Sequence, residues 1–300
     1  MSAITRPLGS ARPVDTRRSH GLWGDALRRL VRNGPALLGM FCIALFVGAA
    51  VFAPLIAPFD PTVGKLADKF LPPGTGGHIW GTDLQGRDLF SRVLYGARIS
   101  LVVGVMSVTV GLAIGGSWGA IAGAVGGRVD SVMMRVVDVL LAIPGILLAI
   151  GVVAWLGQGL PQVMLAVAVA NAPIFARLLR GSMLSVRESD FVIAGRSVGV
   201  PGSRLLLRHM LPNALTPLIV AATLALATAI IDVAGLGFLG LGPADPRTPE
   251  WGSMLTDASG YIRTAAWVVF FPGVAIVISA IGFNLLGDGL RESLDPRLKR

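Results

Sequence analysis

The chain has 300 residues, of which 53% are hydrophobic and 14% are charged, whereas ordinary soluble domains carry about 25% charged residues. Together with a mean hydropathy of +0.71, this composition excludes a soluble globular protein and indicates a membrane protein. The net charge of +9 does not indicate nucleic-acid binding, because the Lys and Arg residues are scattered over segments that flank apolar runs.

Six apolar runs have the length of about 20 residues that a helix needs to cross the hydrocarbon core of a bilayer. They occupy residues 36–57, 98–125, 131–156, 161–182, 214–236 and 265–287. A transmembrane β-barrel would instead show short segments of alternating hydrophobicity. The sequence therefore predicts an all-α membrane protein with six transmembrane helices.

Residues 1–35 form a basic arm that ends in an amphipathic stretch. Apolar residues recur there at helical spacing opposite basic ones: Trp23, Leu27, Leu30 and Val31 against Arg28, Arg29 and Arg32. This pattern predicts a helix lying in the membrane interface. The apolar run that follows exceeds the 7 to 15 residues of a signal-peptide core, so it is expected to stay as the first span. It contains Cys42, the single cysteine, which excludes an internal disulfide.

The basic residues predict the orientation, since Lys and Arg favour the cytoplasmic side of a membrane. Six crossings place both termini on one side, together with the turn near Arg128 and the segment Arg177–Arg208. That side carries 19 of the 26 Lys and Arg residues. The sequence therefore predicts cytoplasmic termini.

The segment at residues 58–97 is then extracytoplasmic. It contains His78, Asp83 and Asp88, which are possible metal ligands, but their spacing fits no calcium-loop pattern and the carboxylates flank Arg87. We expect a turn-rich cap in which the Asp residues cap helices and pair with Arg.

Glycines recur at every fourth position of the second apolar run: Gly111, Gly115, Gly119, Gly123 and Gly127. Small residues at this interval let two helices approach closely in lipid, so they predict a packing seam. The alternative is a seam that slides during a conformational cycle. Prolines also lie inside the runs, at Pro144, Pro173, Pro217 and Pro272, where they are compatible with either fixed kinks or hinges.

Few charged residues lie within the predicted spans, and each is a candidate functional residue because burying it in a membrane is costly. Arg135 and Asp138 are three residues apart, which favours a local ion pair. Asp232 has no charged residue within one helical turn, so it is predicted to face a water-filled translocation path or a partner helix.

The most informative segment is the polar loop, residues 191–213, within a longer connection at 185–213. It is a basic stretch between two apolar runs, which indicates contact with a partner in water. The chain has no phosphate-binding Gly-x-x-x-x-Gly-Lys-Ser/Thr loop and no Gly-x-Ser-x-Gly elbow. It is therefore not predicted to be an enzyme, and any energy source is expected on another subunit.

The polar loop resembles the cytoplasmic signature of ABC importer permeases, with its Gly at Gly199 and its Leu-Pro at Leu211-Pro212. It departs from that signature at Ile193, Gly195 and His209. Several further stretches are similar to the C-type permeases of dipeptide and oligopeptide importers: Pro54 to Pro61, Gly81 to Asp88, Gly237 to Gly242, Trp251 to Leu255, Asn284 to Arg291 and Leu294 to Arg297.

This resemblance implies a type I ABC importer permease fold in the bacterial cytoplasmic membrane. The expected division is an arm at 1–35, a first helix at 36–57, an external segment at 58–97 and a permease core at 98–300. The implied partners are a second related permease, two ATPases, a binding protein and a peptide cargo, with ATP and Mg²⁺ on the ATPases and no cofactor on this chain. Coupling to the ATPases would use Ala194, Gly195, Arg196, Gly199, Pro201, Arg204, Arg208, Leu211 and Pro212.

Three other interpretations remain open from the sequence. The same kind of permease serves other cargoes, such as nickel chelates, glutathione, haem or opines. A stand-alone channel would need no polar docking loop, and a membrane-embedded enzyme would show an acidic or His-rich cluster within the spans.

Overall fold

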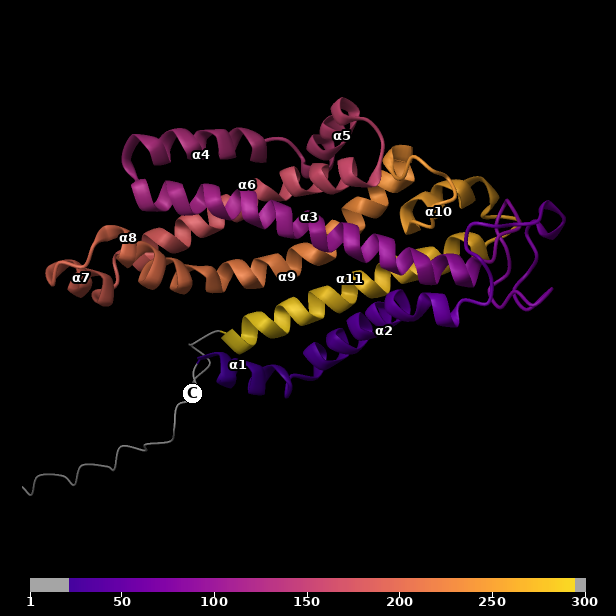
Figure 1. The fold of residues 1–300 in the computed structure, drawn as a ribbon, viewed down its shortest axis with the longest axis horizontal. Helices are drawn as coiled ribbons and strands as arrows, with labels where there is room; N and C mark the ends of the chain where they lie inside the picture. The colour runs from indigo at the N-terminus through magenta and orange to yellow at the C-terminus, as the bar shows by residue number, and fades with distance from the viewer. Residues whose placement is uncertain (1–21, 295–300) are drawn as a thin grey trace, which may run out of the picture.

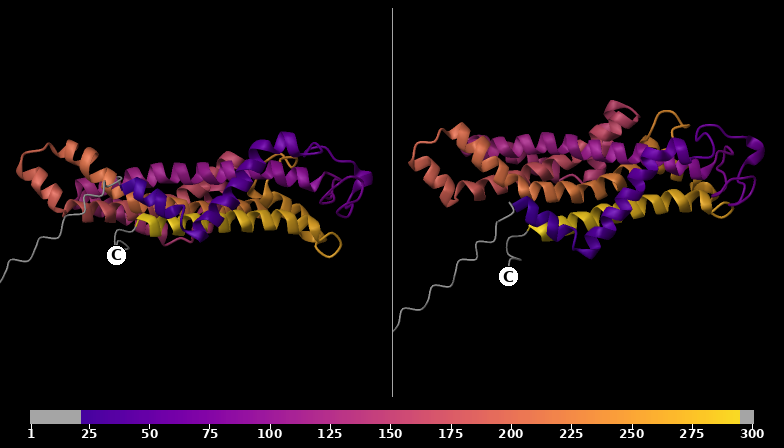
Figure 2. Two further views of the ribbon diagram at one scale, coloured as in Figure 1. Left: turned by 90° about the horizontal axis from the view of Figure 1, so that it is seen from below. Right: turned by 60° about the horizontal axis from the view of Figure 1, so that its bottom comes forward.

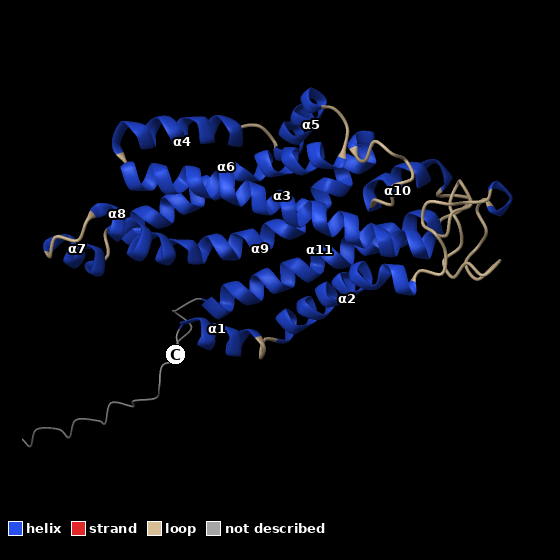
Figure 3. Cartoon of the chain, in the orientation of Figure 1, coloured by secondary structure: helices blue, strands red, loops and turns tan. Residues whose placement is uncertain are grey.

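The computed structural model describes residues 22–294; the predicted N-terminal arm up to residue 21 and the tail from residue 295 lie outside this range. The long helices are α2 (Gly34–Ile56), α3 (Leu89–Val125), α4 (Gly127–Leu141), α5 (Gly145–Leu156), α6 (Leu160–Arg187), α9 (Leu211–Leu236) and α11 (Trp267–Leu294). Shorter helices are α1 (Leu22–Leu30), α7 (Asp190–Ser197), α8 (Gly202–Leu205) and α10 (Trp251–Ala258), with single turns η1 (Leu66–Asp68), η2 (Leu206–Met210), η3 (Gly237–Leu241) and η4 (Ser259–Tyr261). The described chain is thus all-α, as predicted (Figure 3).

Five continuous helical segments are long and apolar enough to cross a membrane: α2, α3, α6, residues 202–241 and α11. The third predicted span, 131–156, is not one helix but a pair, because α4 and α5 meet at 92°. The cause is Pro144, which lacks the N–H needed to continue α4 and disfavours a helical conformation at the preceding Ile143. Figure 1 shows α5 standing away from the direction of α4. Pro173, Pro217 and Pro272, in contrast, lie inside continuous helices.

Helix α3 begins at Leu89, well before the predicted start at residue 98. The Asp88 side chain explains this early start, since its carboxylate accepts the backbone N–H of Ser91 at 2.8 Å and so caps the first turn. The predicted role of Asp in helix capping is confirmed at this position. Part of the segment expected to be external loop is therefore helix.

The α3–α6 pair packs through the glycine-rich face of α3. A Cβ atom on Gly115 would overlap the carbonyl oxygen of Ala172, so the two backbones are in direct contact. Each glycine has its own neighbour on α6: Gly111 meets Ala168, Gly115 meets Ala172, Gly119 meets Ala176 and Gly123 meets Met183. Gly127 does not take part, because it opens α4 with φ +61° and a Cβ atom added to it would have no neighbour within 4 Å.

The helices form an elongated bundle with different structures at its two ends (Figures 1 and 2). The cap, residues 58–88, lies at one end, near α10. Helices α7 and α8 of the polar loop project from the other end, on the same side as α1 and the last turns of α11. Asn33, between α1 and α2, donates its side-chain amide to Glu292 of α11 at 2.6 Å and so links this connection to that helix.

Candidate functional site

The polar loop is anchored to the bundle by buried apolar side chains. Val192, Leu205 and Met210 are buried and belong to the same hydrophobic cluster as Phe175 and Met183 of α6. Interiors packed in this way resist deformation and transmit displacement. The loop is therefore packed onto α6 and α9 through one shared hydrophobic cluster.

A tight turn connects α7 to α8 inside the polar loop. Gly199 has φ +79°, a conformation that side chains other than glycine rarely adopt. Its N–H donates to the carbonyl of Arg196 at 3.0 Å, and Val200 N–H donates to the carbonyl of Gly195 at 3.0 Å. Pro201 then precedes the first residue of α8. The glycine and the proline together reverse the chain between the two short helices.

The start of α9 departs from regular helix because of Pro212. This residue has no N–H and its ring would clash with the carbonyl four residues before it. The turn immediately before, η2, is a π-helical turn, which widens the backbone at that point. The side-chain amide of Asn213 donates to the carbonyl of His209 at 2.6 Å, within this irregular turn.

The outer surface of the polar loop is apolar and basic. Phe191, Ile193, Val198 and Leu207 are 47%, 52%, 80% and 64% exposed. The predicted coupling residues Ala194, Arg196, Gly199, Pro201, Arg204, Arg208 and Pro212 are also exposed, while Gly195 and Leu211 are half-buried. A groove of about 510 Å³ adjoins this surface, lined in part by Arg187 and Arg196. Exposed aliphatic side chains mixed with cations on a rigid support are typical of a protein-docking surface.

Asp232 lies apart from the polar loop. Twenty residues of α9 separate it from Pro212, which corresponds to about 30 Å along the helix. Its side chain is half-buried, and within residues 22–294 it has no hydrogen bond or ion pair. The structure therefore does not join Asp232 to the coupling residues in one site.

The predicted Arg135–Asp138 ion pair is wrong. Asp138 pairs with Arg177 of α6 instead. A second bridge between the same helices joins Asp130 to Arg180 at 2.6 Å. Sequence spacing favoured a pair within α4, whereas the antiparallel packing of α4 on α6 offers Asp138 a partner from another helix.

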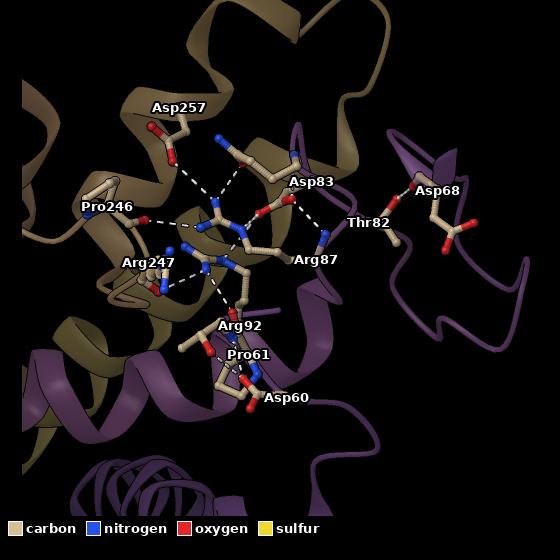
Figure 4. A network of polar contacts seen from close by, with 12 residues as sticks. Asp60, Pro61, Asp68, Thr82, Asp83, Arg87, Arg92, Pro246, Arg247 and Asp257 are labelled. Carbon is tan, nitrogen blue, oxygen red and sulfur yellow. Dashed lines mark hydrogen bonds and ion pairs between the residues drawn. The ribbon is translucent and has the colours of Figure 1, made fainter. Parts of the chain in front are cut away.

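The cap contains a buried polar network that ties three segments together (Figure 4). Asp83 accepts from Nε of Arg87 at 2.6 Å and lies 3.4 Å from Nε of Arg92. Arg92 also donates to the carbonyl of Pro61 at 2.9 Å, and Arg87 donates to the carbonyl of Pro246 at 3.1 Å. The expected pairing of cap Asp residues with Arg is thus confirmed. The network joins the cap to the connection before α10.

His78 and Asp88 bond to each other rather than forming an open ligand set. The ring Nδ1 of His78 lies 2.9 Å from a carboxylate oxygen of Asp88, and both side chains are buried. Within residues 22–294, no group of three or more His, Cys, Asp and Glu side chains is arranged to hold a metal ion.

Glu250 is a buried carboxylate that the sequence pattern did not single out. It accepts the backbone N–H groups of Gly252 and Ser253, each at 2.8 Å, and so caps α10. Burial raises the pKa of Glu250, while the two backbone N–H groups oppose that change. The available signal was an acidic residue directly before Trp251-Gly252-Ser253, since negative charge is favourable at a helix N-terminus, although Glu is not among the common N-cap residues.

Two family models match this chain and identify its family. The family model described as "binding-protein-dependent transport system inner membrane component" matches residues 115–300, and the model described as "N-terminal TM domain of oligopeptide transport permease C" matches residues 21–73. The chain belongs to this family of inner-membrane transport components. It is a multi-pass permease of the inner membrane.

Individual relatives of the permease match almost their whole length. A dipeptide transport system permease protein of Alkalihalophilus pseudofirmus is 43% identical over 99% of this chain and 97% of its own. A di/tripeptide transport system permease protein of Pseudomonas aeruginosa is 44% identical over 89% of each chain. A glutathione transport system permease protein of Escherichia coli is 45% identical over 92% of this chain and 91% of its own.

The permease also shares its fold with a solved structure. An inward-facing form of the MetNI methionine ABC transporter matches with a TM-score of 0.57 and 21% identity, over 68% of this chain and 96% of that chain. The predicted type I importer permease fold is therefore confirmed.

Proposed function

We propose that this permease is a membrane subunit of an ATP-driven importer for dipeptides or short oligopeptides. Relatives that carry the names dipeptide and di/tripeptide permease align over most or nearly all of the chain and support this cargo. Glutathione is the second candidate, because the glutathione permease is equally similar.

The polar loop would couple the permease to ATP hydrolysis on separate subunits. The observation that carries this proposal is the exposed apolar and basic surface of α7, α8 and η2, held on side chains buried in the core. Closure of two ATPases, which would bind ATP and Mg²⁺, would displace the loop and with it α6 and α9. A second related permease and an extracytoplasmic binding protein would complete the importer.

In this arrangement the polar loop, α1 and the end of α11 face the cytoplasm, and the cap faces the binding protein. Asp232 would line or border the translocation path, since it is a half-buried carboxylate on a membrane-crossing helix without a partner in the described range.

Copurification tests the assembly. The chain is tagged at its C-terminus, extracted from its native membrane in mild detergent, and the bound proteins are identified by mass spectrometry. We expect a second permease and one or two ATPases of the P-loop class. Recovery of the chain alone in several mild detergents would contradict the proposal and favour a self-contained channel.

A pair of glycine variants tests the coupling loop. Gly199→Val places a β-branched residue at φ +79°, which costs about 1–3 kcal/mol locally and should distort the α7–α8 turn. Gly202→Val is the control, because Gly202 has equally open surroundings without a positive φ. We expect peptide uptake per inserted permease to fall sharply for Gly199→Val only. Equal uptake by both variants would argue against a coupling role.

A further inference from the structure

A groove on the flank of the bundle has features that transport coupling does not explain. It lies between α2 and α3 and has a volume of about 370 Å³. Its walls are formed by Val47, Ala50, Val51, Arg98, Leu101 and Val102. Val51 is five residues before the end of α2, and Arg98 is nine residues after the start of α3. Val51 is therefore about one and a half helical turns from the cap, and Arg98 about two and a half.

Arg98 is the only charged residue in this groove. Helix α2 contains no Asp, Glu, Lys or Arg at all. Within residues 22–294, Arg98 forms no ion pair, whereas Arg87 and Arg92 on the neighbouring stretch both lie against Asp83. A cation that remains unpaired on an apolar wall in a membrane is costly, so such residues usually reach a partner outside the helix.

The surroundings of Arg98 are exposed and apolar along one stripe of α3. Val102 and Val105 lie one and two turns further on the same face and are 56% and 41% exposed. Val51 on α2 is exposed on the other wall of the groove. Near a helix end, the Arg side chain extends its guanidinium toward the headgroup region while its aliphatic stem stays among apolar groups. Leu101 and Val102 lie further from the cap than Arg98, so along α3 a charged group is followed by apolar surface, as in a phospholipid.

We propose that this groove binds one phospholipid from the membrane leaflet at the cap end. The lipid phosphate accepts hydrogen bonds from the guanidinium of Arg98, a geometry that Arg provides in two parallel donors. An acyl chain lies along Val47, Leu101 and Val102. A phosphate matches the unpaired positive charge, whereas an apolar helix from a second permease would leave Arg98 without a counterion.

The test uses the complex purified from its native membrane in mild detergent. Bound phospholipid is counted by native mass spectrometry for the wild type, Arg98→Leu, and the control Arg263→Leu, which removes an exposed arginine outside the groove. Loss of a charge-assisted hydrogen bond predicts an affinity about tenfold lower for Arg98→Leu. The control should retain the lipid.

A second pair of variants keeps Arg98 in place. Val51→Trp fills the groove, and Leu55→Trp adds the same side chain one turn further along α2, outside the groove. A phospholipid with a photoactivatable acyl chain should label residues 47–51 and 98–102 in the wild type and in Leu55→Trp, and much less in Val51→Trp.

Three outcomes would overturn the proposal. The first is equal lipid occupancy in Arg98→Leu and Arg263→Leu. The second is equal labelling of these residues by the photoactivatable lipid in Val51→Trp and Leu55→Trp. The third is a raised KM for peptide in Arg98→Leu with lipid occupancy unchanged, which would assign Arg98 to the cargo path.

Discussion

Gly115 illustrates how a missing side chain sets the distance between two helices. Its neighbour Gly116 differs only in the face it occupies, because a Cβ at Gly116 would meet Leu218 at 3.8 Å, an ordinary contact. At Gly115 the same atom would overlap the carbonyl oxygen of Ala172. The two adjacent positions therefore separate the effect of close packing from that of helix propensity.

We predict that Gly115→Ala destabilises the permease by about 1–3 kcal/mol, since α3 must move away from α6. Gly116→Ala should be neutral or slightly stabilising, because alanine favours the helix and has room. Thermal unfolding in detergent, followed by the loss of monodisperse complex, compares the two. Equal unfolding temperatures would show that the seam tolerates separation, as a sliding seam would.

Glu250 predicts a pH dependence of stability. Its pKa in the folded protein is raised above the ordinary 4.5 by burial. The folded protein therefore binds this proton more tightly than the unfolded chain. The resulting stabilisation is fully present below the ordinary pKa and is lost as the pH rises through the raised value.

Glu250→Gln removes this titration while keeping an oxygen acceptor for the α10 N-terminus. Measured from about pH 4.5 upward to pH 8, the unfolding temperature of the wild type should decline more steeply than that of Glu250→Gln. Asp245→Asn, which changes an exposed carboxylate in the connection before α10, serves as the control. Parallel curves for wild type and Glu250→Gln would contradict the assignment.

At the scale of elements, the polar loop is attached to the core by some side chains and exposes others to solvent. Leu205 and Leu207 are two residues apart but face opposite ways, with 4% and 64% exposure. The first fixes the loop to the cluster around α6, and the second lies on the proposed docking surface. Attachment and docking can therefore be disturbed separately.

Leu205→Ala should destabilise the permease by about 2–5 kcal/mol, because it leaves a cavity in the core. It should also raise the number of ATP molecules hydrolysed per peptide transported, because a loosened polar loop would transmit less displacement. Leu207→Ala should leave stability within about 0.5 kcal/mol of wild type but reduce ATPase copurification. Unfolding temperature, ATP hydrolysis and uptake are measured on each complex. Identical behaviour of the two variants would refute this separation of roles.

At the scale of the whole molecule, the cap and the polar loop lie at opposite ends of the bundle (Figure 1). If the basic end is cytoplasmic, cysteines placed at the two ends must be accessible to a thiol reagent from opposite sides of the membrane. In a Cys42→Ala background, Thr75→Cys should react with an impermeant maleimide added outside, and Ser203→Cys should react only after the membrane is opened. Both positions are exposed. The reverse pattern would invert the proposed orientation.

Composition and local pattern were enough to predict the membrane class, the helical content and most of the spans, because the length and apolarity of a helix are properties of consecutive residues. The capping of α3 by an Asp residue could likewise be predicted, because Asp88 accepts the N–H of Ser91, only three residues away. The glycine interval predicted close packing on α3 without indicating the partner helix.

Tertiary structure decided the rest, because the outcome depended on residues far apart in the chain. The ion pair of Asp138 goes to Arg177 on α6, and Glu250 is buried against Ser100 and Gly237. The bend between α4 and α5 follows from Pro144, but Pro173 and Pro217 leave their helices continuous. Sequence alone determined that this is a helical transport permease of the membrane; which charges meet, and which prolines break a helix, was decided by how the helices pack.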